Sequence, residues 1–262
     1  MHALQTIIES LNQEFALTAA MAAELECYVM LADESAASMD AFWVPVEAAF
    51  RAENLPILRI EKERGLHQYE VITQVTTPAR LAETLDAIRR IMMQQATQMD
   101  ISLRFDAKPF ANQPSSGLHI HIHLADSEGV NVFHKTEEWT SDYLRHSLAG
   151  LLETLPAQMP MFFPNAEDVA RLDDTDHVPK IFGWGVNNRY CALRIPMDPD
   201  PYNKRIEHRV PCANANPEAV IESILAGMLH GLRARIEPPE QEHGKTSARG
   251  FKEALALAAI RE

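Results

Sequence analysis

The stretch SSGLHIHIHLAD, residues 115–126, places three histidines at every second position. Side chains alternate between the two faces of a β-strand, so the pattern predicts a strand in which His119, His121 and His123 share one face. A lone histidine is more often a hydrogen-bonded core residue than a ligand, and that alternative stays open for His121 and His123. The function of this face depends on what the neighbouring strands bring to it.

Two other stretches alternate in the same way with charged residues. AELECYVM places Glu24 and Glu26 on one strand face, and RIEHR places Arg205, Glu207 and Arg209 on one face. Strands with this alternation usually turn one face toward a core and the other away from it. We therefore ask whether the acids, arginines and histidines share a function on their sheet faces.

Helical periodicity and capping residues divide the rest of the chain. We expect helices at residues 3–13, 38–54, 76–99, 136–156 and 216–236, and strands at residues 24–32, 56–63, 67–75, 101–108, 117–126, 189–197 and 204–211. Thr77 and Asn216 each precede a proline, which predicts capped helix starts, and Gly65 predicts a hairpin. Residues 156–180 contain four prolines and predict a long loop. The pattern predicts an α+β domain over residues 1–262, a sheet with helices on its outer face, ending in a linker and short helix from about residue 237.

Charge and hydropathy argue against two classes of protein. The 262 residues carry 24 Lys and Arg against 37 Asp and Glu, a formal charge of −13, which is unlike a nucleic-acid binder. No run reaches the roughly 18 apolar residues of a membrane span. Cys27, Cys191 and Cys212 are scattered and form no CxxC pair, so neither a disulfide framework nor a zinc ribbon is indicated. A reduced, cytoplasmic compartment is expected.

Carboxylates dominate the expected strands. Glu24, Glu26, Glu63, Glu70 and Glu207 lie on these strands or at their ends, and His119 adds an imidazole. Such a set suits a hard divalent cation, magnesium or manganese, better than zinc, which favours nitrogen and sulfur. The alternative is an acidic sheet face exposed to solvent, because charged residues are mostly exposed.

Arginines gather in the second half of the chain, at positions 171, 189, 194, 205 and 209. A guanidinium beside a metal-binding carboxylate is what phosphoryl transfer requires, because it balances the charge that develops on the phosphate. The alternative is a surface ladder of ion pairs with little energetic weight. The sequence has no GxGxxG motif, no P-loop and no nucleophile elbow.

Taken in order, these motifs resemble the catalytic domain of the glutamine synthetase family, the γ-glutamyl amide ligases. The resemblance runs through AELECYVML, EKERGLHQYEV, SSGLHIHIHL, GVNNRYCALRIP and KRIEHRVPCANANPEAVIESILAG, and it covers residues 20–235 approximately. It implies a curved antiparallel sheet that forms half of a funnel, with helices outside and metal ions at the funnel waist.

The resemblance also implies a role for each matching residue. One metal ion would be bound by Glu26, Glu63 and Glu70, and a second, on the transferred phosphate, by Glu24, His119 and Glu207. The phosphates and the substrate carboxylate would be bound by Arg189, Arg194, Arg205 and Arg209. The nucleotide would lie near His121, Arg194 and Arg205. Arg171 would bind the α-carboxylate of a glutamate-like substrate, with Ser116 and Gly117 beside it. For His123 the resemblance implies no role, because the family usually has a small polar residue there.

The implied reaction has two steps and uses ATP as co-substrate with magnesium or manganese. ATP phosphorylates a side-chain carboxylate to give an acyl phosphate, and an amine then displaces phosphate to give an amide. The expected partners are a small carboxylate and an amine, and not nucleic acid or a membrane. A homo-oligomer, smaller than the family's double ring, is also expected.

Four departures from the family pattern affect the ammonium and amino-acid sites but not the metal set. The N-terminal β-grasp domain is not found in the sequence, and the C-terminal region is short. The flap glutamate of the family falls on His177 by counting, with Asp174 and Asp176 close by. The Asn-Gly pair of the family falls on Pro114 and Ser115. We therefore expect ATP-dependent carboxylate activation with an amine other than free ammonia. The alternatives are a non-catalytic nucleotide- or amino-acid-binding homologue and a partner subunit of a full-length relative.

Overall fold

The computed structural model describes residues 2–31, 36–134, 140–174, 178–246 and 250–251. The α-helices in these residues are α1 His2–Phe15, α2 Ala36–Ala52, α3 Pro78–Gln98, α4 Asp142–Phe162 and α5 Pro217–Ala234. Two short 3-10 helices are η1 Ala166–Asp173 and η2 Pro201–Asn203. The strands are β1 Thr18–Met30, β2 Ile57–Lys62, β3 Gln68–Thr73, β4 Ser102–Arg104, β5 Leu118–Ala125, β6 Ile181–Val186, β7 Cys191–Ile195 and β8 Ile206–His208.

One sheet joins these strands in the order β2-β3-β1-β5-β8-β7-β6, and β4 pairs with β1 beside that path. The α+β class predicted from the sequence is confirmed. The sheet is mixed, because β6 and β7 at one edge pair in parallel. Residues 187–190 carry the chain back along β6, so that Tyr190 accepts a hydrogen bond from the amide of Lys180. Strand β8 pairs antiparallel with β5 on one side and with β7 on the other, as expected.

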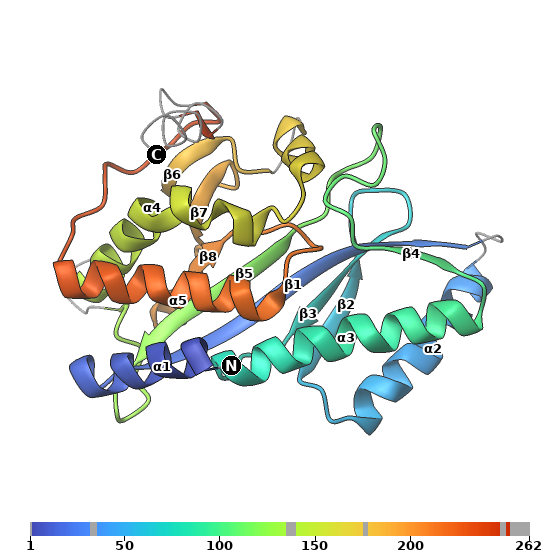
Figure 1. The fold of residues 1–262 in the computed structure, drawn as a ribbon, viewed down its shortest axis with the longest axis horizontal. Coiled ribbons are helices and arrows are strands. Elements are labelled where there is room, and N and C mark those ends of the chain that lie inside the picture. The colour runs from blue at the N-terminus through green and yellow to red at the C-terminus, as the bar shows by residue number, and fades with distance from the viewer. Residues whose placement is uncertain (1, 32–35, 135–139, 175–177, 247–249, 252–262) are drawn as a thin grey trace.

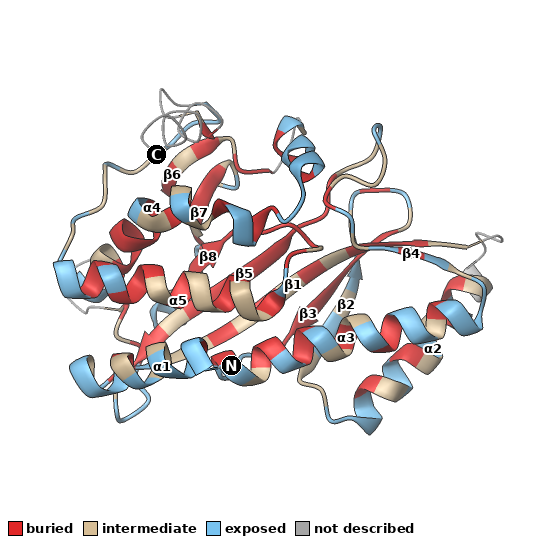
Figure 2. Cartoon of the chain, in the orientation of Figure 1, coloured by how far each residue is buried: buried red, intermediate tan, exposed pale blue. Residues whose placement is uncertain are grey.

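The helices cover one face of the sheet (Figure 1). Helices α1 and α3 contact β1, and α5 lies between α1, α3 and α4. Alternating apolar residues of the strands face this layer and are buried, among them Met21, Leu25 and Ile120. Figure 2 shows the buried residues concentrated on the strands and on the helix surfaces turned toward them. The opposite face of the sheet is therefore left for the acids and histidines, which alternate with these core residues.

Two helix starts and one hairpin follow the sequence closely. The hydroxyl of Thr77 accepts a hydrogen bond from the Arg80 amide, and Asn216 accepts one from the Ala219 amide, so both residues cap helices whose first residue is proline. Strands β2 and β3 pair antiparallel around the turn that contains Gly65. These features depend on local interactions, which explains why sequence patterns predict them.

The long loop expected from residue 156 begins later than predicted. Helix α4 continues through Pro156 and Pro160 to Phe162, and η1 occupies part of the remaining stretch. Each proline removes one helical hydrogen bond. Leu155, Met159 and Phe162 are buried along the same turns, and their packing outweighs that loss. The helical period of residues 136–156 also predicts a buried stripe of Trp139, Tyr143, Leu148, Leu151 and Leu155. The three leucines are buried as predicted, Tyr143 is exposed, and Trp139 lies outside the described residues.

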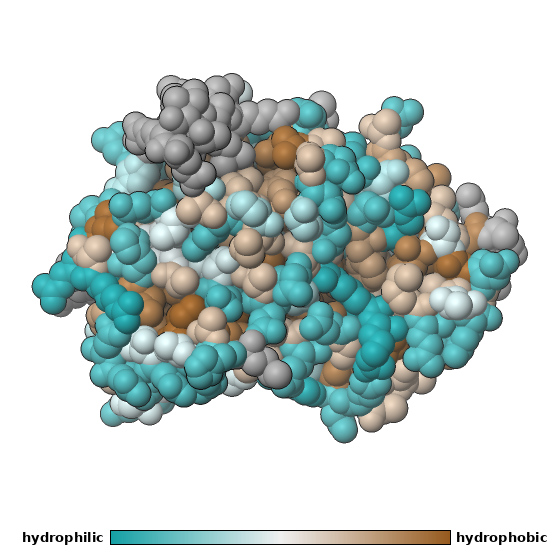
Figure 3. Space-filling model, viewed as in Figure 1, coloured by the Kyte–Doolittle hydropathy of each residue, from teal (hydrophilic) through white to brown (hydrophobic). Residues whose placement is uncertain are grey.

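The outer surface of the helix layer is mostly hydrophilic, with hydrophobic side chains scattered over it (Figure 3). Across the part of the chain that the structure describes, none of the helices is long and apolar enough to cross a membrane. The three cysteines are buried and unpaired, in agreement with the absence of a disulfide framework.

Candidate active site

Strand register brings the predicted site residues onto one face of the sheet. Glu26 of β1 lies opposite Glu70 of β3, and Glu24 of β1 lies opposite His119 of β5. On the other side of β5, Glu207 of β8 lies between His121 and Arg194. Directly opposed residues of neighbouring strands project to the same face and lie close enough to interact. Five strands therefore build one continuous site.

The first cluster contains the three carboxylates predicted to share one metal ion. Glu26, Glu63 and Glu70 each place an oxygen within 4.8 Å of the others. The amide of Gly117 donates a hydrogen bond of 2.7 Å to Glu26 Oε2. Burial raises the pKa of Glu26 to about 7. Burial, and then the neighbouring carboxylates, also raise the pKa of Glu70. Carboxyl groups crowded in this way are stabilised in their charged form by a bound cation.

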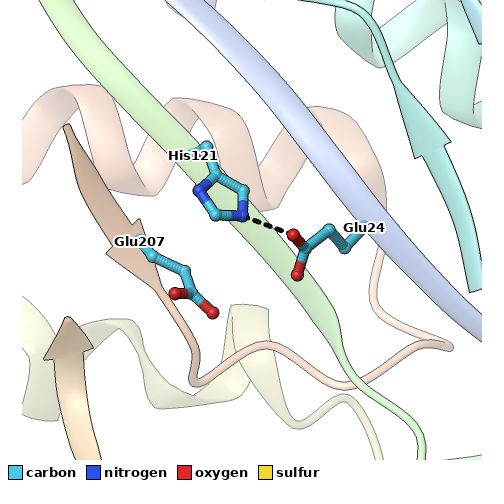
Figure 4. Close-up of side chains that lie close together, drawn as sticks. All are labelled: Glu24, His121 and Glu207. Carbon is cyan, nitrogen blue, oxygen red and sulfur yellow. Dashed lines mark ion pairs between the residues drawn. The ribbon is translucent and has the colours of Figure 1, made fainter. Parts of the chain in front are cut away.

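The second cluster surrounds Glu24. Glu24 Oε2 lies 3.3 Å from His119 Nδ1, and Glu24 Oε1 lies 2.9 Å from His121 Nε2 (Figure 4). Two sets of three potential ligand atoms lie within 4.8 Å: Glu24 with His119 and Glu70, and Glu24 with His121 and Glu207. The predicted third member of the His119 set, Glu207, has Oε1 3.9 Å from His119 Nδ1.

Protonation in this cluster favours metal ligation. Burial lowers the pKa of His119 to about 4, which leaves a neutral imidazole at pH 7. Burial alone would raise the pKa of Glu24, but the hydrogen bonds from His119 and His121 outweigh it and lower that pKa. For Glu207 burial is likewise outweighed, chiefly by Arg209, and the pKa is lowered. Ionised carboxylates beside a neutral histidine are a donor set for magnesium or manganese.

His121 lies between an arginine and Glu24. Arg205 Nε donates to His121 Nδ1 over 3.3 Å. On the other side of the ring, His121 Nε2 lies 2.9 Å from Glu24 Oε1. A histidine held in this way can orient the carboxylate beside it.

The arginines fall into three groups. Arg194 and Arg209 both form ion pairs with Glu207, whose side chain is 1% exposed. Arg205 lies apart from them and pairs with Asp198 at 3.3 Å. Arg171 is buried below the site, where its Nη1 and Nη2 donate to the carbonyls of Val210 and Arg209. The burial of these ion pairs is unlike the exposed surface ladder that the sequence left open.

A cavity of about 310 Å³ gathers most of the predicted residues. All six predicted metal ligands line it, together with Arg171, Arg189, Arg194 and Arg209. A second cavity of about 390 Å³ adjoins it and is lined by His121, His123 and Arg205, with Glu24 on the wall of both. Ser116 is fully buried, where its hydroxyl lies 3.4 Å from Gln68 Nε2, and the cavity wall is formed by Pro114 and Ser115 instead. His177 lies outside the described residues.

Sequence patterns missed several residues of the cavity wall, among them Arg59, Glu61, Arg64 and Gln68. Asp174, named only as an acid near position 177, also lines the cavity; it forms an ion pair with Lys108 and accepts a 2.6 Å hydrogen bond from the Ser115 amide. Arg59, on β2, forms an ion pair of 2.6 Å with Glu61. Alternation on β2 gave a signal for Arg59 and Glu61, whereas Lys108 lies in a loop and gave none.

Comparison with known proteins places this arrangement in a family. Residues 35–260 match the model of the catalytic domain of glutamine synthetase. The chain belongs to the glutamine synthetase family, and the matched part is its catalytic domain.

The curated relatives include enzymes with different named amines. γ-Glutamylputrescine synthetase of Escherichia coli (strain K12) is 37% identical over 158 residues, which are 60% of this chain and 33% of that protein. γ-Glutamylethanolamide synthetase of Streptomyces coelicolor is 33% identical over 156 residues, 60% of this chain and 33% of the relative. Glutamine synthetase of Pyrococcus abyssi is 30% identical over 179 residues, 68% of this chain and 40% of the relative. The matched segments therefore span between a third and two fifths of the length of these relatives.

Solved structures agree on the fold. Glutamine synthetase of Plasmodium falciparum superposes with a TM-score of 0.85 at 16% identity, over 94% of this chain and 57% of that chain. GmaS in its ligand-free form superposes with a TM-score of 0.82 at 20% identity, over 99% of this chain and 65% of that chain. Identities this low support the fold and do not by themselves assign an activity.

Proposed function

We propose that the protein is an ATP-dependent carboxylate–amine ligase that joins the side-chain carboxylate of a glutamate-like acid to an organic amine. The observation that carries the proposal is the convergence of six acid and histidine side chains and four arginines on one cavity of about 310 Å³. A site with both signs of charge, closely spaced, suits transfer of a phosphoryl group to a carboxylate. Each residue role given below is part of this proposal.

The donor sets fit magnesium or manganese. Glu26, Glu63 and Glu70 would hold one ion, with the raised pKa values of Glu26 and Glu70 as the sign that positive charge is needed there. Glu24, His119 and Glu207 would hold a second, supported by the 3.3 Å between Glu24 and His119 and the 3.9 Å between His119 and Glu207. When bound, the ions supply positive charge that neutralises phosphate oxygens and the acid substrate. His121, which contacts Arg205 on one side and Glu24 on the other, would keep the Glu24 carboxylate in place.

Arginine side chains would bind the anionic groups. Arg171 would bind the acid beside the backbone of Gly117. Its guanidinium is held by hydrogen bonds to the carbonyls of Val210 and Arg209. Arg189, Arg194 and Arg209 would stabilise the transferred phosphoryl group, and Arg205 would bind the nucleotide in the adjoining cavity. Guanidinium groups held in advance by buried partners need little reorganisation when charge develops.

The bond changes are those of acyl activation. A carboxylate oxygen of the acid attacks the γ-phosphorus of ATP, the bond from that phosphorus to the bridging oxygen breaks, and ADP leaves. The amine nitrogen then attacks the acyl carbon, phosphate leaves with the bonding pair, and a base takes the proton from nitrogen. His177 is the residue we assign to this base, since it occupies the flap position by counting and histidine has an ordinary pKa near 6.5 in model compounds.

An organic amine is preferred over ammonium in this proposal. The family's flap carboxylate is replaced by His177, which removes a negative charge on which a small ammonium ion depends. Two of the relatives are named for putrescine and for ethanolamine, so the family accommodates amines larger than ammonia. A larger amine gains contacts with the cavity wall that ammonium cannot make.

Release of ADP tests the proposal directly. The purified chain is supplied with ATP, magnesium and glutamate, and with ammonium, ethanolamine or a diamine in turn. We expect ADP release to depend on an organic amine and to exceed the rate with ammonium. A rate with ammonium equal to that of every organic amine would contradict the amine preference. No ADP release with any amine, while MgATP still binds, would favour a non-catalytic binding protein.

A further inference from the structure

Residues 237–246, which follow helix α5, run along β6 at the end of the sheet, and we call them the C-terminal strap. Trp184 Nε1 donates to the carbonyl of Pro239 over 2.8 Å, and the amide of Glu242 donates to the carbonyl of Trp184 over 2.9 Å. Strand β6 is the last strand of the sheet order, so the strap supplies partners to an edge that would otherwise meet solvent.

Two glycines of β6 make this approach possible. A Cβ atom on Gly185 would lie 2.7 Å from the Glu242 carbonyl oxygen and 2.8 Å from Asn188 Cβ. A Cβ atom on Gly183 would lie 3.1 Å from Glu242 Cγ. Glycine inside a strand often marks a site where another backbone comes close. The two glycines of the IFGWGV sequence therefore leave the space that the strap occupies beside β6.

The strap also grips the connection between β6 and β7. Asn188 Nδ2 donates to two strap carbonyls, that of Glu242 at 3.2 Å and that of Gly244 at 2.9 Å. On its other side Asn188 Oδ1 accepts the amide of Tyr190 over 3.0 Å. One side chain thus joins the strap to the backbone of residues 187–190.

This connection touches three of the arginines assigned to the phosphate site. Asn187 Oδ1 accepts a hydrogen bond of 2.5 Å from Arg194 Nη2. Arg189 is itself part of the connection, and its carbonyl accepts a 3.3 Å hydrogen bond from Arg209 Nε. The connection therefore determines where these guanidinium groups lie relative to Glu207, with which Arg194 and Arg209 form ion pairs.

We infer that Asn188 is a positioning residue and that the C-terminal strap, through Asn188, holds the arginines of the phosphate site in place. The inference rests on the proposed function only for its ligand. The mechanical part concerns the protein alone: a detached strap releases residues 187–195, and the guanidinium groups lose their fixed positions. Binding of phosphate groups then weakens, whereas binding of the uncharged nucleoside does not.

Two variants separate the strap from the connection. Asn188→Ala removes the side chain that joins them, and Glu242→Pro removes the amide that anchors the strap to Trp184 while the sequence of residues 187–195 stays unchanged. The matched controls are Asn12→Ala, on the exposed side of α1, and Glu240→Pro, at an exposed strap position. Amide hydrogen exchange of residues 187–195 is measured first, in the protein without ligand. Affinity for MgADP and for adenosine is measured next by calorimetry.

We expect both variants to speed exchange in residues 187–195 and to weaken MgADP binding about tenfold, the lower end of the effect of losing an orienting partner. Adenosine affinity and both controls should stay at wild-type values. Wild-type exchange in Asn188→Ala or Glu242→Pro would overturn the inference, whatever the ligand. Faster exchange in a protein whose wild type does not bind MgADP would instead overturn the proposed function and leave the strap's positioning role standing. Equal weakening of MgADP and adenosine would show a general loss of structure and contradict a phosphate-specific role.

Discussion

Gly117 provides the space in which the guanidinium of Arg171 lies. A Cβ atom at position 117 would overlap Arg171 Nη2 and would lie 2.9 Å from His119 Nε2. Gly117 also donates its amide to Glu26, so one residue without a side chain lets an arginine, a histidine and a glutamate converge. Any larger residue must displace one of them.

Gly117→Ala should therefore impair binding of the acid substrate. We expect Arg171 to shift, the KM for glutamate to rise about tenfold or more, and unfolding free energy to fall by about 1–3 kcal/mol, as for other overpacked sites. Steady-state kinetics and denaturant unfolding check both effects. Ser127→Ala, at an exposed position after β5, is the control. An unchanged KM for glutamate in Gly117→Ala would show that Arg171 does not bind the acid substrate.

Glu207→Gln should remove metal-dependent activity while keeping the volume of the side chain. The amide still accepts hydrogen bonds but carries no charge, so we expect magnesium affinity to fall about tenfold or more and ADP release to disappear. Calorimetric titration with Mg²⁺ measures the first and a coupled assay the second. Glu9→Gln, at an exposed position of α1, should leave both unchanged. Wild-type magnesium affinity in Glu207→Gln would show that the ligand assignment is wrong.

Glu70→Gln should stabilise the metal-free protein. Burial raises the pKa of Glu70, and the carboxylates of Glu24, Glu26 and Glu63 beside it raise it further, so the folded metal-free protein disfavours the charged form of this side chain. We expect the midpoint of thermal unfolding in EDTA to rise, and the further rise caused by magnesium to shrink or vanish. Both are read from the same thermal scans. A variant that is less stable than wild type in EDTA and equally stabilised by magnesium would contradict this account of the cluster.

The buried His208 side chain should make the free energy of unfolding fall as the pH is lowered. It lies on the helix-facing side of β8 against Phe162, and neither ring nitrogen has a hydrogen-bond partner among the residues that the structure describes. Burial lowers its pKa to about 3. The unfolded chain binds a proton near pH 6.5, so it binds more protons than the folded chain below that pH. The contribution of His208 to stability is thus complete above pH 6.5 and falls by up to about 1.4 kcal/mol per pH unit between pH 6.5 and 3.

The matching experiment compares wild type with His208→Leu by denaturant unfolding at several pH values. The leucine side chain of the variant is uncharged throughout, so we expect its acid-side loss of stability to be shallower than that of wild type. Above pH 7 the histidine is neutral in both states, so the free-energy difference between the two proteins should no longer change with pH. Parallel curves at every pH would show that His208 does not titrate with unfolding.

Period-two alternation predicted the site face well because it depends only on strand geometry. Once Glu24, His119 and Glu207 are placed on strands, register brings them together without further information. β6 was missed because Gly183 and Gly185 weaken its strand pattern, and the reason for those glycines lies in Glu242, far along the chain. Two further contacts could not be predicted, because only the folded chain brings their loops together. They are the ion pair of Lys108 with Asp174 and the hydrogen bond from Arg194 to Asn187.

The sharing of Glu207 by two arginines makes the cavity respond to a combination of ions. In the protein by itself, the two positive charges of Arg194 and Arg209 share the one negative charge of Glu207, so one positive charge beside that carboxylate stays uncompensated and can attract an anion. A free cation meets a carboxylate that is already engaged. An anion and a cation that arrive as one chelate can each take one half of this internal ion pair, so the chelate supplies a new partner to both the carboxylate and the guanidinium groups that it separates.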